Sequence, residues 1–130
     1  MNERIKEYLT NVIETSVYET EPYENKNDEL LVTICSAIGE RNGKIAISLV
    51  YEICQRHGFD KKEFIKRVEK ERCRQEKLHP YNENTNYEMI AIEELGESVK
   101  AYNDLDENGM IEELIQFASV IVRMIEIGEY

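Results

Sequence analysis

Three glutamates in the C-terminal part of the chain have the residue type and spacing of a metal site. Glu94 and Glu97 lie three residues apart, which places them on one face of a helix. Further along, Glu113 falls about a quarter turn from the middle of an apolar helical face, where a glutamate is costly unless it is paired or bound to a metal. With Gln116 one turn further, four oxygen donors suit magnesium, or alternatively manganese, rather than zinc.

Two facing helices must position these donors. Helical periodicity predicts one helix over 87–102 and a second over 110–127, joined by the acidic loop 103–109. If the two pack antiparallel, Glu94, Glu97 and Glu113 meet, and Gly96 leaves room for another helix or a ligand to approach. The opposite side of the last helix is expected to face solvent, and it carries Glu112, Ser119, Arg123 and Glu126. The competing interpretation of the glutamates is a solvated acidic face.

The rest of the chain is also predicted to be helical. Apolar spacing indicates helices over 2–19, 29–40, 44–57 and 61–77, and Thr20–Asp28 is a polar connector. A β-hairpin over 29–57 is the alternative to the two middle helices, since both stretches contain β-branched residues. Capping-box patterns begin at Asp60 and Thr85, and Gly58 marks a helix end. These elements predict a single all-α domain over 1–130, a helical bundle with short loops.

Composition narrows the class of protein. The chain has 130 residues, of which 42% are hydrophobic and 33% charged, and no apolar run has the length of a membrane span. We expect no membrane association and no signal peptide. The three cysteines form no C-x-x-C motif, so a reducing, cytoplasmic location is expected. Cys54 and His57 could share a helix face, but such a pair is far more often structural than a ligand site.

The net charge of −11 is unevenly distributed. Residues 56–77 carry a net +4, whereas residues 81–130 carry −10. This division has two interpretations. The helices could carry solvated faces with charges of both signs, or the acidic and basic helices could line one site that binds cations on one side and phosphate on the other. The overall negative charge argues against nucleic-acid binding, which needs cationic surface. A helix-turn-helix DNA reader over 44–77 is nevertheless a minor alternative, because a basic helix follows the turn at Gly58.

One stretch of the chain resembles a known family. Ile92-Glu93-Glu94-Leu95-Gly96-Glu97, followed by Glu112-Glu113-Leu114, is similar to the motifs of the MazG-like nucleoside triphosphate pyrophosphohydrolases. The resemblance covers roughly 68–127 and implies an all-α, MazG-like core over 61–130, with residues 1–60 adding helices of unassigned role. It also implies magnesium bound by Glu94, Glu97, Glu113 and Gln116. Gln116 departs from the family pattern, which has Asp there, and the downstream basic motif of longer members is missing.

The resemblance implies hydrolysis of a nucleoside triphosphate to the monophosphate and pyrophosphate, in a homodimer or homotetramer. Glu93 or Glu97 would orient the attacking water. Substrate phosphates would contact Lys77, Lys100 and Arg74, with Arg72 behind them. The competing interpretation of each of these residues is an ordinary surface cation. His79 and Tyr81 are candidates to stack on a base. The alternative function is a catalytically weak MazG-like protein that binds a nucleotide or a protein partner.

Overall fold

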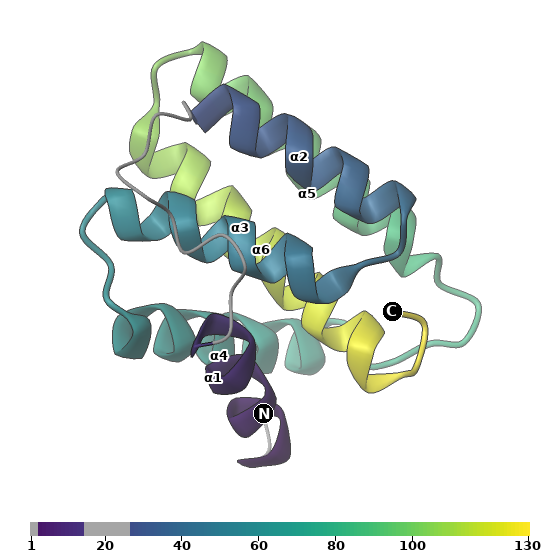
Figure 1. The fold of residues 1–130 in the computed structure, drawn as a ribbon. Helices are drawn as coiled ribbons and strands as arrows, with labels where there is room; N and C mark the ends of the chain where they lie inside the picture. Colours follow the sequence, from purple (N-terminus) through teal and green to yellow (C-terminus); the bar gives the residue numbers. More distant parts are fainter. Residues whose placement is uncertain (1–2, 15–26) are drawn as a thin grey trace.

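The chain folds as an all-α bundle, as its sequence predicts. A computed structural model describes residues 3–14 and 27–130, and these form six helices and no strand (Figure 1). The helices are α1 (Glu3–Glu14), α2 (Asn27–Gly39), α3 (Gly43–Arg56), α4 (Lys61–Leu78), α5 (Tyr87–Asn103) and α6 (Glu107–Glu126). The β-hairpin alternative over 29–57 is therefore wrong. Residues 15–19 of the predicted first helix and most of the connector that follows lie outside the described residues.

The last helix, α6, lies at the centre of the bundle. It packs against α3, α4 and α5, while α2 packs on α3 and α1 packs on α3 and α4 (Figure 1). A helix that is apolar on nearly every side must be enclosed by others. The buried apolar residues of α6 satisfy this condition; they are Met110, Ile111, Leu114, Ile115, Phe117, Ala118, Val120, Ile121, Val122 and Met124.

Side-chain caps fix where the helices begin. Asp60 accepts a hydrogen bond from the Glu63 amide at 2.8 Å, which confirms the predicted start of α4. The cap of α5 is Asn86 rather than Thr85, because the Asn86 side chain accepts from the Met89 amide. The prediction that the last helix begins at residue 110 is wrong. Asp106 accepts from the Gly109 amide at 2.9 Å, so α6 begins at Glu107.

The expectation that one side of α6 faces solvent is wrong for two residues. Ser119 is fully buried and Arg123 is only 4% exposed. The reason is α4, which covers this side: the Ser119 hydroxyl lies 3.3 Å from the Val68 carbonyl of α4 and also donates to the Ile115 carbonyl. Glu112 is exposed as expected. Sequence periodicity shows where the apolar face lies, but not how many neighbours a helix has.

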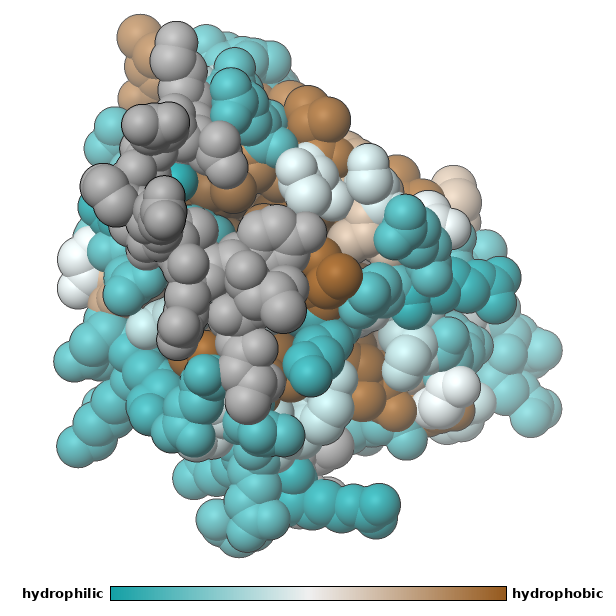
Figure 2. All heavy atoms as spheres, in the orientation of Figure 1, coloured by the Kyte–Doolittle hydropathy of each residue, from teal (hydrophilic) through white to brown (hydrophobic). Residues whose placement is uncertain are grey.

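Polar side chains cover much of the surface. Figure 2 shows hydrophilic residues over the lower part of the molecule, where α1 and α4 lie in Figure 1. Large exposed apolar side chains include Val32 on α2 and the pair Met89 and Ile92, which lie one turn apart on α5. None of the helices in the described part of the chain has the length and apolarity that a bilayer crossing requires.

Candidate metal centre

The hairpin of α5 and α6 brings three glutamates together. Glu94 and Glu97 project from adjacent turns of α5, and Glu113 projects from the first half of α6. One carboxylate oxygen from each residue can be chosen so that all lie within 4.8 Å of one another. The sequence predicted this meeting. We call these three residues the acidic cluster.

The acidic cluster is partly withdrawn from water. Glu94 and Glu113 are half-buried, and the Oε2 atom of each is inaccessible and has no hydrogen-bond partner. Burial raises the pKa of both carboxyls above the ordinary value. Glu97 is exposed, but the adjacent Glu113 carboxylate raises its pKa as well. Three carboxylates at this spacing are stabilised by sharing protons or by binding a cation.

Gln116, the fourth predicted donor, lies one turn beyond Glu113 on α6. Its side chain lines a cavity of about 430 Å³ that it shares with Glu71 and Arg74 of α4. Its backbone carbonyl accepts a hydrogen bond from the Gln75 side chain at 3.2 Å. Gln116 therefore contributes to the boundary between α4 and α6. Its role as a metal ligand stays a prediction.

The candidate residues for water activation and phosphate binding differ in their surroundings. Glu93 is exposed beside Glu94, and its charge adds to the rise in the pKa of Glu94. Lys100 is exposed on α5 and counteracts part of the rise in the pKa of Glu97, so its charge acts on the acidic cluster. Arg74 forms an ion pair with Glu71. Lys77 lies at the exposed end of α4, in a separate groove.

A second cavity adjoins the acidic cluster at Glu94. It has a volume of about 300 Å³ and lies between α4, α5, α6 and the loop that joins α4 to α5. Its polar wall includes Arg74, His79 and Thr85, and its apolar wall includes Tyr87, Ile90 and Val120. His79 thus lines this cavity, while Tyr81 stacks on Tyr87 with ring centroids 6.1 Å apart. A polar end at Glu94 and an apolar wall suit a ligand that is charged at one end.

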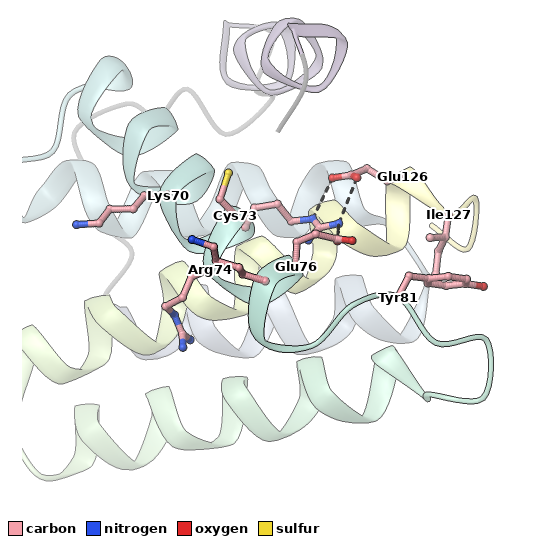
Figure 3. Close-up of a pocket in the computed structure, with 9 residues that line it drawn as sticks. Lys70, Cys73, Arg74, Glu76, Tyr81, Glu126 and Ile127 are labelled. Atoms are coloured by element: carbon pink, nitrogen blue, oxygen red, sulfur yellow. Dashed lines mark hydrogen bonds and ion pairs between the residues drawn. The ribbon is translucent and has the colours of Figure 1, made fainter.

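The sequence reasoning missed a group of paired charges at the C-terminal ends of α4 and α6. Arg72 donates to both carboxylate oxygens of Glu126, at 3.1 and 3.3 Å, beside a groove of about 790 Å³ (Figure 3). Arg72 and Arg123 each lie 2.8 Å from the Glu76 carboxylate. Arg123 also donates to the His79 carbonyl at 2.9 Å. We call Arg72, Glu76, Arg123 and Glu126 the arginine network.

One signal in the sequence could have indicated the arginine network. Arg123 interrupts a run of apolar residues on α6, and Arg72 and Glu76 have the i, i+4 spacing of a helical ion pair. A lone arginine on an apolar helix needs partners when it is buried. The network fixes the α4–α5 loop, because Arg123 holds the His79 carbonyl and stacks its guanidinium 5.1 Å from the centre of the Tyr87 ring.

Comparison of the chain with models of known protein families, with curated proteins and with solved structures finds no match. The fold and the acidic cluster define the class of molecule on their own: an all-α bundle with a candidate cation site between two helices of one hairpin.

Proposed function

We propose that this chain is a magnesium-dependent nucleoside triphosphate pyrophosphohydrolase, similar to the MazG-like enzymes. The observation that carries the proposal is the acidic cluster, with carboxylate oxygens from Glu94, Glu97 and Glu113 within 4.8 Å of one another. The buried Oε2 atoms of Glu94 and Glu113 have no hydrogen-bond partner, which fits oxygen ligands for a hard cation. Magnesium bound there would offset phosphate charge and lower the pKa of a water.

The surrounding residues support the same chemistry. Glu94, Glu97 and Glu113 would hold the ion, and Glu93 or Glu97 would accept a proton from the attacking water and orient it. Arg74 and Lys100 bring positive charge to the edge of the acidic cluster, where phosphates would lie. The 300 Å³ cavity next to Glu94 would receive the rest of the nucleotide. Because the resemblance to the MazG-like enzymes implies an oligomer, we also propose that the chain forms a homodimer or homotetramer in solution.

The decisive experiment measures pyrophosphate release from a panel of ribo- and deoxynucleoside triphosphates with magnesium, manganese or EDTA. Glu113→Gln and Glu97→Ala should each lower metal-dependent release at least about 100-fold, because each removes a charged ligand. Glu112→Gln is the matched control: Glu112 is next to Glu113 but exposed, so its loss should change the rate less than about threefold.

Binding measurements separate the site from its activity. Manganese should raise the thermal midpoint of the wild-type chain and of Glu112→Gln, but not that of Glu113→Gln, since an ion bound only by the folded state stabilises it. Equal manganese binding and equal rates in Glu113→Gln and the wild-type chain would refute the assignment of the site.

Gln116 favours a second candidate function, a catalytically weak protein that binds a nucleotide or a protein partner through the same helices. An amide at this position brings no charge to a metal, and its side chain lines a cavity shared with α4. Manganese binding without release of pyrophosphate from any triphosphate would support this function. Gln116→Asp then tests the cause, because a gain in metal affinity or rate would show that Gln116 limits the site.

A further inference from the structure

An ion pair on α4 borders the acidic cluster. The Arg74 Nε atom donates to both carboxylate oxygens of Glu71, at 3.1 and 2.9 Å. The Glu71 side chain is only 14% exposed, whereas that of Arg74 is 53% exposed. The Gln75 side chain lies 3.4 Å from Glu71 Oε1 and donates to the Gln116 carbonyl, which ties this part of α4 to α6. Glu71 is thus held in place, and Arg74 is the more exposed partner of the pair.

Arg74 lies where the two cavities meet. It lines the 430 Å³ cavity together with Glu71 and Gln116, and the 300 Å³ cavity together with Glu94. Arg74 therefore shares a cavity with a member of the acidic cluster while it is paired with Glu71. The charges act in both directions: Glu71, and to a lesser extent Glu94, raise the pKa of Arg74, and Glu71 contributes to the raised pKa of Glu94.

We propose that the balance of charge between Glu71 and Arg74 modulates the cation affinity of the acidic cluster, and that Arg74 exchanges Glu71 for an anionic group of the ligand. This inference rests on the proposed function. A negative charge at Glu71 strengthens cation binding nearby, and a positive charge at Arg74 weakens it. In the intact pair the two effects nearly cancel. When a phosphate takes Arg74, the Glu71 charge acts on the cluster alone, so cation and anion bind cooperatively.

A double-mutant cycle tests the pair, with the dissociation constant for manganese measured by titration calorimetry in the absence of nucleotide. Glu71→Gln should weaken manganese binding about threefold to tenfold, and Arg74→Gln should strengthen it by a similar factor. The double variant should return close to the wild-type affinity, since it removes both charges. Lys66→Gln, which removes an exposed cation from the same helix but outside both cavities, should change the affinity less than about twofold.

The exchange of Glu71 for an anion is tested by measuring the binding of a nucleoside triphosphate analogue in excess manganese. The analogue is one that cannot be hydrolysed between its α- and β-phosphates. Arg74→Gln should weaken analogue binding about tenfold, although it strengthens the binding of manganese alone. Such opposite signs in one variant are not expected from a merely structural ion pair.

Failure of this inference differs from failure of the metal centre. Equal manganese affinities for all four members of the cycle, with Glu113→Gln still abolishing binding, would leave the metal centre intact and show that Glu71–Arg74 is only a surface ion pair. If Glu113→Gln also keeps the wild-type affinity, the metal centre is wrong and this inference falls with it. Far-UV circular dichroism should show that every variant keeps its helices.

Discussion

The acidic cluster and the arginine network both include residues of α6, but they hold their glutamates under opposite conditions. In the arginine network, Glu76 lies 2.8 Å from both Arg72 and Arg123, and hydrogen bonds from these arginines lower its pKa. In the acidic cluster, burial raises the pKa of Glu94 and Glu113. One region matches every acid with an arginine; the other gathers three acids without an equal number of cations.

This difference separates charges that stabilise the fold from charges that suit a ligand. A paired charge lowers the free energy of the folded state only while its partner is present, so its removal is costly. A group of like charges raises the free energy of the folded state until a proton or cation joins it. The carboxylates of the acidic cluster can therefore still gain free energy by binding a cation, whereas those of the arginine network are already paired within the chain. Variants that break one region should have effects opposite in sign to those that break the other.

The largest effect on stability is expected from Arg123→Met. This change leaves the His79 carbonyl without its donor and removes one of the two arginines that bind the Glu76 Oε2 atom, so the free energy of unfolding should fall by about 2–4 kcal/mol. Urea denaturation measures it. Arg74→Met is the control on a half-exposed arginine and should cost at most about 0.5–1 kcal/mol. If the two losses were equal, the arginine network would not be a structural unit.

A second test uses pH, with EDTA present throughout. The carboxyls of the acidic cluster have raised pKa values, so the folded state binds more protons than the unfolded state above the ordinary value of 4.5. Stability should therefore fall as the pH rises from 4.5 through the raised pKa values. Glu76 acts oppositely: its stabilisation is complete above 4.5 and is lost as the pH falls toward its lowered pKa.

Glu113→Gln should flatten the fall in stability above pH 4.5, because it removes one raised carboxyl and the charge that raises the pKa of Glu97. Thermal midpoints of the variant and the wild-type chain, measured across this range, provide the comparison. Parallel curves for the two proteins would mean that the pKa of Glu113 is not raised in the folded state.

The smallest effect is expected from Gly96→Ala, which adds a methyl group between Glu94 and Glu97 without changing a charge. A Cβ atom at Gly96 meets no atom within 4 Å, so better helix propensity should raise stability by about 0.5–1 kcal/mol. At Gly43 a Cβ atom lies 3.1 Å from Ile121 and from Ile125, so Gly43→Ala should show no such gain. Thermal unfolding of both variants checks this. Destabilisation by Gly96→Ala would indicate that something packs against this face of α5 in solution.

The parts of the fold and of the candidate site that could be predicted from the sequence are those made by residues close to one another in the chain. The facing of Glu94, Glu97 and Glu113 follows from helical periodicity and one short loop, and the structure confirms that they meet. The start of α6 was misplaced, because the cap formed by Asp106 was not recognised. The burial of Arg123 was missed for a different reason: its partners lie on α4 and in the loop after it, far away in the chain.

The Glu71–Arg74 pair shows the same limit. Its i, i+3 spacing is visible in the sequence, but its position beside Glu94 depends on how α4 packs against α6. Nothing in the sequence motif alone places a residue of α4 next to the acidic cluster. Local patterns predicted the helices that carry the cluster, whereas its surroundings required the packing of the whole bundle.

The short turn between α5 and α6 has a consequence for how the molecule assembles. All three glutamates belong to one hairpin, so little chain entropy is lost when their carboxylates meet. Proteins rich in contacts between residues close in sequence fold faster than those that depend on distant pairings. We therefore expect the like charges to meet once this hairpin closes, with Ala91, Leu95 and Leu114 supplying buried apolar surface on the same two helices. The three carboxylates should thus meet regardless of the order in which the other helices pack against this hairpin.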